Sequence, residues 1–496
     1  MQSLSEQLAV EFLEEYRRSG LYLRDNISQL AQFAISDDLE IAESATRALF
    51  TGLVERLADS FEPAAVTLYN RIFSQVIQIC RRHPRAAILD RRLREFNLGS
   101  EEELIARAEK LRRVETLDAK SDWAERLQLV VVLSRVTLGA DVAITSVMLE
   151  RIKREFPDAD MVLVGGSKTA ELFGGDSRLR IRELDYGRAG TTVSRLLVWT
   201  ALLGCIRELT RGLKPDGYLI VDPDTRLTQL GLLPVTPPKE IAFGPTQQRG
   251  HYLFFPSREY GNSESKPVGE LTSDWLSQVF GEDTRVYPAL SLRSEDIEAA
   301  RGLAAEMMRN RPMVAINFGF GDNRLKRAGA DFEILLVSRL IQEGFAIILD
   351  KGAGEEESRR ADTVIGEATR IESDGRRSRV VEIDEQSLKE AAMSGDAAAD
   401  MLVWNGRIGV LAALIAQSNL YIGYDSAGQH IAAALGVPCI DVFAGFSSRR
   451  FVERWRPSGK SETRVVAVDD IADQCGLVSH VLRAAREMLS KHDSRR

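Results

Sequence analysis

The sequence lacks the features that mark disulfide-rich, zinc-binding, secreted and membrane-spanning proteins. Its four cysteines occur singly along 496 residues, without the paired spacing of a zinc site or a disulfide framework. The N-terminal segment carries glutamates where a secretory signal has an apolar core. No stretch approaches the roughly 18 consecutive apolar residues that a membrane-spanning helix needs. We therefore expect a cytoplasmic protein with reduced thiols.

A surplus of basic residues is also missing. The net charge is −8 at pH 7 and the isoelectric point is near 5.5, whereas a general nucleic-acid binder carries a basic surplus. We therefore expect no nucleic-acid partner. The hydrophobic share of 44% and the charged share of 28% are those of a globular protein. Because the chain is too long for one hydrophobic core, two or three domains are predicted.

Residues 1–120 show helical periodicity and no strand pattern. After Pro63, apolar residues up to Cys80 recur at steps of three and four, which predicts one buried helical stripe. Ser100 and Glu103 form the pattern of a capping box ahead of another apolar stripe. These patterns predict a helical accessory domain, whose role in recruiting an acceptor or building an oligomer is open.

An arginine-rich stretch lies within this helical region. Residues 81–94 hold several arginines, and a phosphate or an anionic membrane surface would attract them. Asp90 interrupts the stretch and Glu95 follows it, which favours a solvated helix face. Contact with the inner face of the membrane stays open.

From about residue 125 the pattern changes to alternating strands and helices. Short apolar runs bounded by turn residues are typical of parallel strands covered on both faces. The predicted strands are Leu127–Leu133, Met161–Val164, Tyr218–Val221, Met313–Asn317 and Phe345–Leu349. We predict an α/β protein with two Rossmann-like, doubly wound domains, over residues 121–295 and 296–496. Ligands of such sheets bind at the carboxyl ends of the strands.

The most informative segment is the end of one predicted strand at Asp425. An alanine-rich helix follows it, and the first backbone N–H groups of a helix lack partners and favour an anion. Ser426, Ala427 and Gly428 are small enough to let a phosphate approach, and His430 offers a polar group nearby. The segment predicts a phosphate-binding turn. A strand-to-helix turn without a ligand, with His430 as a core residue, is the alternative.

Asp222 and Asp224 flank a proline directly after another predicted strand. An acidic pair in such a place can hold a divalent cation on a nucleotide diphosphate. Proline and aspartate are also common turn residues, and we favour the turn. No metal is expected.

Four segments, in this order, resemble glycosyltransferase family 9, the ADP-heptose:lipopolysaccharide heptosyltransferases. They are Arg135–Ser146 with Phe156–Ala159, Asn317–Gly319 with Lys326, Lys351–Glu357, and Asp425–Pro438. The resemblance spans roughly residues 125–475. It implies the GT-B fold, in which two Rossmann-like domains face a cleft, and the transfer of a sugar from a nucleotide-diphosphate donor.

The resemblance also implies roles for individual residues. Asp141 matches the catalytic aspartate, which as a carboxylate would take the proton of the acceptor hydroxyl. Gly319 and Lys326 match the glycine turn and the lysine that face the diphosphate. Glu356 matches the glutamate that holds the ribose, although three consecutive glutamates leave the register open. The turn at Asp425 completes the donor site.

The sequence departs from the family pattern in its ligand loops. The family's Gly-Asp is Ala140-Asp141 here, its Thr-Pro is Ser146-Val147, and its Asp-Thr-Gly is Asp425-Ser426-Ala427. These changes leave open which sugar the donor carries and which nucleobase its nucleotide contains. The acceptor is a surface glycan or another hydroxyl, including one on a protein. Two other functions stay open, namely a nucleotide-sugar epimerase or hydrolase and a binding scaffold without catalysis.

Overall fold

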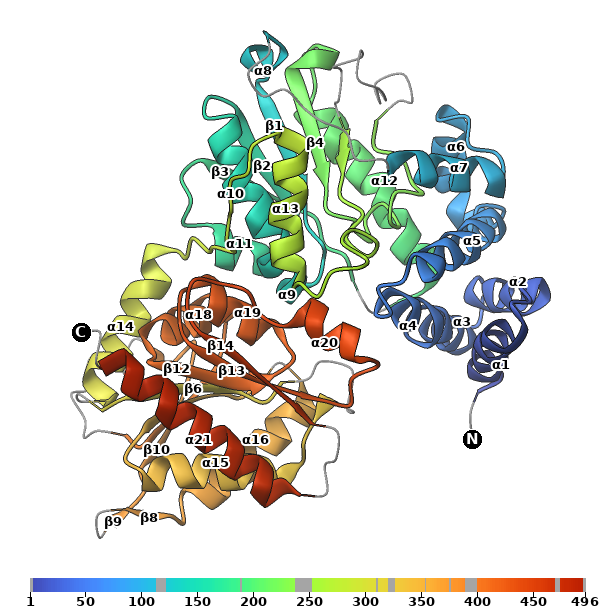
Figure 1. Cartoon of the computed structure of the whole chain (residues 1–496). Coiled ribbons are helices and arrows are strands. Elements are labelled where there is room, and N and C mark those ends of the chain that lie inside the picture. The colour runs from blue at the N-terminus through green and yellow to red at the C-terminus, as the bar shows by residue number, and fades with distance from the viewer. Residues whose placement is uncertain are drawn as a thin grey trace.

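The computed structural model describes residues 3–112, 122–187, 190–236, 252–308, 311–319, 326–352, 354–373, 376–388, 399–468 and 473–493. Two α/β domains lie one above the other, and a bundle of helices lies beside them (Figure 1). The α/β class, the two parallel sheets and the helical N-terminal region are therefore confirmed. The predicted boundary at residues 120 and 121 falls outside the described residues, as does residue 321 of the predicted glycine turn.

The helical region is a bundle of short helices around one core. It contains α1 (Leu4–Ser19), α2 (Arg24–Ala34), α3 (Leu39–Arg47), the π-helix η1 (Ala48–Val54), α4 (Glu55–Ala58), α5 (Pro63–Cys80), the 3-10 turn η2 (Pro84–Ala86), α6 (Ala87–Glu95) and α7 (Glu101–Leu111). Pro63 is the first residue of α5, and Ser100 and Glu103 form the predicted capping box.

The arginine-rich stretch is paired with acids of the same region. Arg81 is buried, and its guanidinium lies 2.6 Å from the Asp90 carboxylate. Arg94 pairs with the same carboxylate at 2.8 Å, and Arg92 pairs with Glu95 at 2.7 Å. The prediction of a solvated face is therefore wrong for Arg81, because this side chain is buried in the helical bundle.

The first α/β domain has a parallel sheet in the order β3-β2-β1-β4-β5. Its strands are β1 (Leu129–Leu133), β2 (Asp160–Gly165), β3 (Leu179–Glu183), β4 (Tyr218–Asp222) and β5 (Tyr252–Phe254). Its helices are α8 (Asp122–Arg126), α9 (Leu138–Ala140), the π-helix η3 (Asp141–Thr145), α10 (Ser146–Glu155), α11 (Ser167–Phe173), α12 (Thr192–Leu209), the 3-10 turn η4 (Pro215–Gly217) and α13 (Val268–Phe280). All five residues of β1 are buried, as its continuous apolar run predicts.

The second α/β domain has a parallel sheet in the order β10-β11-β7-β6-β12-β13-β14. Its strands are β6 (Met313–Asn317), β7 (Ala346–Asp350), β10 (Val380–Asp384), β11 (Met401–Asn405), β12 (Leu420–Tyr424), β13 (Cys439–Ala444) and β14 (Thr463–Val468), with a small hairpin of β8 (Glu372–Ser373) and β9 (Arg376–Arg377). Its helices are α14 (Ser294–Met308), α15 (Ala330–Gln342), α16 (Glu355–Ala368), α18 (Ile408–Gln417), α19 (Ala427–Ala434), α20 (Arg449–Trp455) and α21 (Gln474–Asp493).

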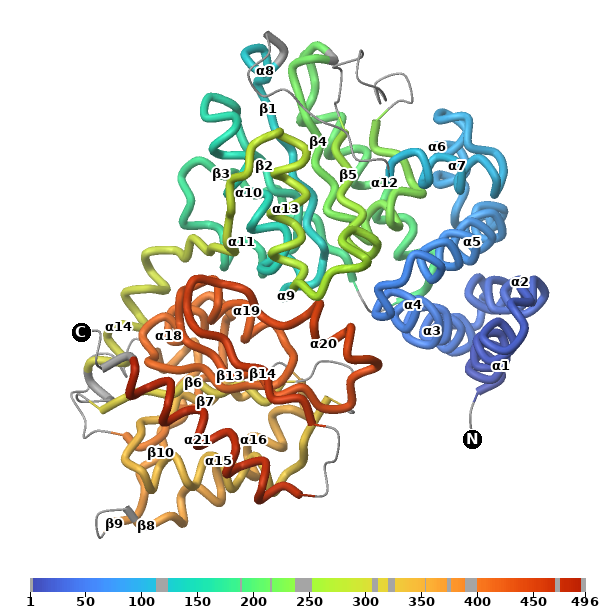
Figure 2. The backbone as a smooth tube through the Cα atoms, viewed as in Figure 1, coloured from blue at the N-terminus to red at the C-terminus, as the bar shows by residue number. Residues whose placement is uncertain are grey.

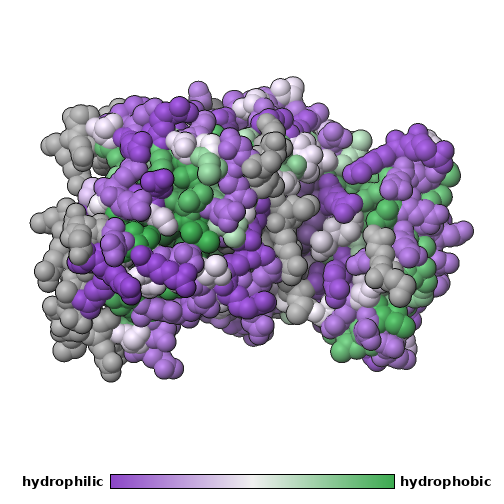
Figure 3. Space-filling view, turned by 90° about the horizontal axis from the view of Figure 1, so that it is seen from below, coloured by the Kyte–Doolittle hydropathy of each residue, from purple (hydrophilic) through white to green (hydrophobic). Residues whose placement is uncertain are grey.

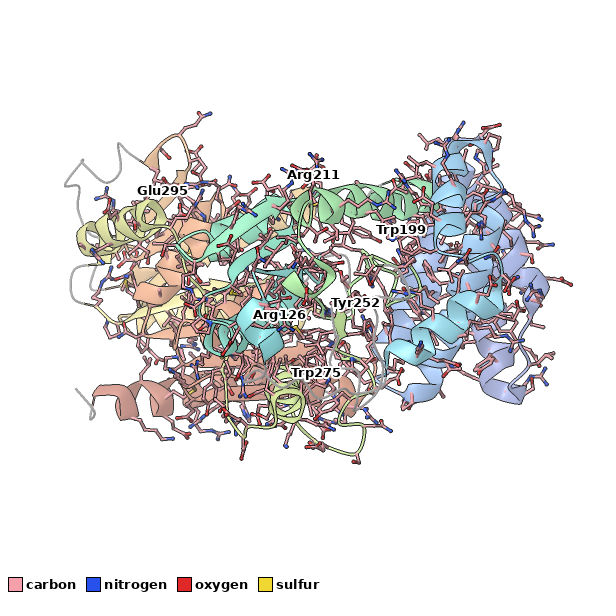
Figure 4. All side chains as sticks on the ribbon, turned by 90° about the horizontal axis from the view of Figure 1, so that it is seen from above. Arg126, Trp199, Arg211, Tyr252, Trp275 and Glu295 are labelled. Carbon is pink, nitrogen blue, oxygen red and sulfur yellow. The ribbon has the colours of Figure 1, made fainter. Side chains whose placement is uncertain are left out.

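Helix α12 joins the helical region to the first sheet. Leu202 and Ile206 pack with the sheet, whereas Leu196 and Trp199 belong to the core of the helical region. Figure 4 shows Trp199 where α12 approaches the helical region, and Figure 2 shows the same neighbours as a tube. Apolar residues on both of these faces are buried. No helix in the described part of the chain is long and apolar enough to cross a membrane.

The lower face of the molecule carries mostly hydrophilic side chains (Figure 3). Figure 3 shows the lower face, on which hydrophobic residues gather in separate areas of the second α/β domain and of the helical region.

Candidate functional site between the two sheets

The N-terminus of α19 faces the first α/β domain. Ser426 is the N-cap residue, and Gly428 lies on the ring of Tyr421, because a Cβ at Gly428 would be 2.1 Å from the Tyr421 hydroxyl oxygen. Across the cleft, a Cβ at Gly139 would be 3.4 Å from the Cα of Ala427 and 3.2 Å from the His430 ring. Small residues on both sides thus let the loops of the two domains meet at a helix N-terminus.

Lys326 lies beside this helix N-terminus. Its ammonium nitrogen is 2.5 Å from Oδ2 of Asp425 and 3.4 Å from the Asp425 carbonyl oxygen. Burial lowers the pKa of Lys326, but the Asp425 carboxylate outweighs burial, so the pKa is raised above its ordinary value. A charged lysine and unpaired helix N–H groups at one place can bind a diphosphate. The structure therefore brings together the predicted residues Lys326, Asp425, Ser426, Ala427 and Gly428.

His430 is buried one turn into α19. Burial lowers the pKa of its imidazole to about 4, despite the nearby Asp425 carboxylate. The ring packs edge-on against Trp455 of α20 at 6.0 Å between centroids, and Trp455 packs edge-on against Phe61 of the helical region at 5.8 Å. His430 is therefore neutral at pH 7, between the helix N-terminus and an aromatic pair.

A second group of polar residues gathers at the ends of β6 and β7. The Asn317 side chain accepts a hydrogen bond from the Gly319 backbone N–H at 2.8 Å and donates one to Asp350. A Cβ at Gly319 would be 3.3 Å from a carboxylate oxygen of Glu357. Burial raises the pKa of Asp350 to about 6, and the Glu357 carboxylate adds to this effect.

Glu357, one residue after the predicted Glu356, is the glutamate that approaches this group. A Cβ at Gly352 would be 2.8 Å from Oε2 of Glu357, so its carboxylate lies against the glycine loop. Glu356 instead pairs with Arg360, one turn along α16. Three consecutive glutamates occupy three different faces of a helix, and only the tertiary structure determines which of them faces the cleft.

Asp141 is buried inside the first α/β domain. Its carboxylate accepts hydrogen bonds from the Ser134 hydroxyl at 2.6 Å, the Arg135 backbone N–H at 2.7 Å and the Thr145 hydroxyl at 2.8 Å. Its residue exposure is 2%, and burial raises its pKa against the lowering effect of these donors. In this arrangement Asp141 holds the loop that carries Gly139 to the other domain.

The acidic pair after β4 is occupied by protein donors. Asp222 accepts hydrogen bonds from the Thr228 hydroxyl at 2.6 Å, the Tyr252 hydroxyl at 2.5 Å and the Thr225 backbone N–H at 2.8 Å. Burial raises its pKa to about 6. Asp224 accepts a hydrogen bond from Ser257 at 2.9 Å. In the described ranges, no group of three or more metal-binding side chains of His, Cys, Asp or Glu is found.

Two further carboxyl groups near the site belong to no sequence motif. Asp441 on β13 is fully buried, and no hydrogen bond to its carboxyl oxygens is found within the described residues. Burial and the nearby Asp425 raise its pKa well above the ordinary value. Asp59 comes from the helical region and lies near Lys326 and Arg258, whose charges act on it. Asp59 carries no signal in the sequence, because the charged groups Arg258 and Lys326 that act on it lie some 200 to 270 residues later in the chain.

The fold defines the class of protein, and comparison with known proteins shows which family the chain resembles. The structure resembles that of a family 9 glycosyltransferase from Veillonella parvula DSM 2008, with a TM-score of 0.53, 15% sequence identity, and coverage of 76% of this chain and 100% of that one. Two parallel Rossmann-like domains that face each other at α19 thus have the GT-B fold.

Residues 385–475 match the family model of glycosyltransferase family 9 (heptosyltransferase). This match contains the whole α19 segment and confirms the predicted resemblance to the family and its class of enzyme, a glycosyltransferase. More distant likenesses include E. coli ADP-heptose lipopolysaccharide heptosyltransferase II, with a TM-score of 0.47, 13% identity, and coverage of 74% of this chain and 100% of that one. An E. coli heptosyltransferase solved with ADP gives a TM-score of 0.47, 14% identity, and coverage of 73% and 100%. No curated protein sequence matches significantly.

Proposed function

We propose that the protein transfers a heptose or a related sugar from a nucleotide-diphosphate donor to an acceptor hydroxyl. The observation that carries the proposal is the ammonium group of Lys326 beside the N-terminus of α19, whose first residues are small. The family match covers this same segment. The acceptor is a surface glycan or a protein hydroxyl, and we place the reaction on the cytoplasmic side of the membrane.

The diphosphate binds at the α19 N-terminus, with Ser426, Ala427 and Gly428 next to it and Lys326 as the cation. As the bond between the sugar and the diphosphate breaks, negative charge develops on the leaving group. A preorganised helix terminus and a lysine stabilise that charge without reorganisation. The site supplies this stabilisation from its own residues, so we propose that transfer needs no added metal.

The nucleoside lies toward the ends of β6 and β7. The absence of a side chain at Gly319 and Gly352 lets Glu357 approach the backbone there, and its carboxylate is one to which two ribose hydroxyls can donate. We assign to Glu357 the ribose contact that the resemblance gave to Glu356. His430, neutral at pH 7, offers a hydrogen bond to the sugar or the phosphate.

The resemblance gives Asp141 the role of base, and Asp141→Asn tests it. If Asp141 takes the proton, the variant still binds donor and loses transfer. If Asp141 only supports the segment around Gly139, the Asn side chain still has one oxygen that accepts a protein hydrogen bond. The variant then loses activity only as far as this segment becomes less ordered.

The proposed function is tested with a panel of nucleotide diphosphates and nucleotide sugars in a thermal-shift assay. A ligand that binds only the folded state raises the melting temperature by mass action. Stabilisation by the nucleotides of one nucleobase identifies the donor class. Release of the nucleotide diphosphate from that donor then measures turnover. Binding without turnover under any acceptor supports the scaffold alternative. An altered sugar formed from donor alone supports an epimerase. Activity restored by manganese after EDTA treatment contradicts the metal-free proposal.

A further inference from the structure

We infer that the helical region completes the active site, and that Asp59 in the turn after α4 takes the proton from the acceptor hydroxyl. This inference rests on the proposed function. It gives a catalytic role to the part of the chain that lies outside the roughly 125–475 span of the family resemblance. The chemical class of the acceptor group is an alcohol, whose oxygen attacks the sugar.

The turn that carries Asp59 is fixed to both α/β domains. On one side, the Arg258 guanidinium donates a hydrogen bond to the Ala58 carbonyl oxygen at 2.8 Å. On the other side, the Phe61 ring packs edge-on against Trp455, and Phe61 is 2% exposed. Phe61 adopts a φ of 53°, a left-handed conformation that is rare for a bulky residue and is maintained here by these contacts. Figure 1 shows α4 at the level where the two sheets face each other.

The basic groups around Asp59 are each engaged elsewhere. Lys326 pairs with Asp425 at 2.5 Å, and Arg226 pairs with Glu55 at 3.3 Å. Arg258 bonds Ala58 and also lies 3.6 Å from the Asp224 carboxylate. Within the described residues, no hydrogen bond or ion pair to the Asp59 carboxylate is found. Asp59 is therefore a partly buried carboxylate that keeps its lone pairs for an incoming donor.

The charges that face Asp59 set its protonation. Burial raises the pKa of Asp59 to about 6, and Glu55 adds to that increase, while Arg258, Lys326 and Arg226 oppose it. A carboxylate with a pKa near 6 is mostly ionised at pH 7 and is a stronger base than an ordinary aspartate.

The location of Asp59 fits the reaction. Phe61, two residues after Asp59, packs against Trp455, and Trp455 packs against His430 of α19, so the turn that carries Asp59 lies near the α19 N-terminus. The charges of Asp59 and Lys326 also act on each other. In the transfer step, the acceptor O–H bond breaks and its proton passes to the Asp59 carboxylate. The acceptor oxygen forms a bond to the anomeric carbon, and the bond from that carbon to the diphosphate oxygen breaks. The electron pair of the broken bond leaves with the nucleotide diphosphate, beside Lys326.

Asp141 provides the comparison. Its carboxylate has three protein donors at 2.6 to 2.8 Å, whereas Asp59 makes no such bond with the described residues. A base needs a free lone pair directed at the substrate. The geometry therefore assigns proton transfer to Asp59 and support of the loop to Asp141.

The test compares the full-length wild type with Asp59→Asn, Asp59→Glu and the control Asp37→Asn. Asp37 lies on the surface of the same helical region, where it pairs with Arg85. Each protein is assayed for stabilisation by ADP, for ADP release from ADP-heptose with water as acceptor between pH 5 and 8, and for unfolding by urea at pH 5 and pH 8.

We expect Asp59→Asn to keep the ADP stabilisation and to release ADP at least 100-fold more slowly, which is the usual size of a general-base contribution. Asp59→Glu recovers part of the rate, and the wild-type rate falls below a pH of about 6. Asp59→Asn also raises the urea midpoint at pH 8 and raises it less at pH 5, because it removes a carboxylate that is costly to ionise. Asp37→Asn behaves as the wild type in every assay.

Two results would overturn the inference. One is an Asp59→Asn rate within a few-fold of the wild type with the same dependence on pH. The other is a lower urea midpoint for Asp59→Asn at pH 8, which would make Asp59 a structural residue. A wild type that no nucleotide diphosphate or nucleotide sugar stabilises contradicts the proposed function instead. The urea comparison then still shows whether Asp59 is an unpaired carboxylate that destabilises the fold when it is ionised.

Discussion

The ammonium nitrogen of Lys326 lies 2.5 Å from the Asp425 carboxylate, at the N-terminus of α19. A diphosphate that binds here has to share this lysine with Asp425 or replace the carboxylate as its partner. The ion pair therefore keeps the lysine charged and positioned before the donor arrives, and the donor gains only the difference between the two interactions.

Removal of this lysine should weaken nucleotide binding. We expect Lys326→Ala to lower the affinity for ADP about 10- to 100-fold, since a hydrogen bond to a charged group contributes roughly 1.5–3 kcal/mol. Isothermal titration calorimetry measures the change. Lys153→Ala is the control, because Lys153 pairs with Glu150 and Asp176 away from the cleft. Equal affinity in both variants would place the diphosphate elsewhere.

The neighbouring glutamates of α16 should differ in their effect. We expect Glu357→Gln to weaken ADP binding by about tenfold and Glu356→Gln to leave it unchanged, because only Glu357 lies against Gly319 and Gly352. The loss of a hydrogen bond to a charged group accounts for this size. Inorganic pyrophosphate, which has no ribose, should bind both variants as it binds the wild type. A larger loss of ADP affinity in Glu356→Gln than in Glu357→Gln would instead support the ribose contact predicted for Glu356.

A methyl group at Gly428 should strain the turn of α19. Its carbon would lie 2.1 Å from the Tyr421 hydroxyl oxygen, so the ring or the helix has to move. We expect Gly428→Ala to lower the free energy of unfolding by about 1–3 kcal/mol and to weaken ADP binding. Gly204→Ala in α12 is the matched control. Its Cβ would meet no atom within 4 Å, and alanine stabilises a helix by about 0.5–1 kcal/mol. Urea denaturation measures the free energy of unfolding of both variants. An equal change in the two would contradict the prediction.

The buried imidazole of His430 should make stability depend on pH. Its folded pKa of about 4 lies below the ordinary value of 6.5, so the unfolded chain binds a proton in this interval and the folded chain does not. The contribution of His430 to stability is therefore complete above pH 6.5 and is lost as the pH falls toward 4. We expect the wild type to lose about 1–3 kcal/mol more than His430→Gln between pH 7 and pH 4.5.

Urea midpoints at several pH values measure this difference. His480→Gln, which removes an exposed histidine of α21, is the control and should follow the wild type. Parallel pH profiles for the wild type and His430→Gln would show that the imidazole protonates in the folded protein as easily as in the unfolded one.

The sequence by itself determined the local features of this protein. The apolar runs of β1, β6 and β7 predict buried parallel strands, because a strand covered on both faces needs apolar residues at every position. The capping box at Ser100 and the small residues after Asp425 are equally local, since each motif acts on backbone groups within a few residues. The sheets, the helical region and the turn after Asp425 all follow from such patterns.

Only the tertiary structure decided which side chains are available for chemistry. Asp141 is the first residue of η3, and three donors surround its carboxylate. Glu357 lies against Gly319 and Gly352 whereas Glu356 pairs with Arg360, because the rotation of α16 about its axis is set by packing. The charge of Lys326 acts on Asp59 from 267 positions later in the chain, and no periodicity can indicate that proximity. Burial and hydrogen bonding depend on distance in space, whereas a sequence pattern records only distance along the chain.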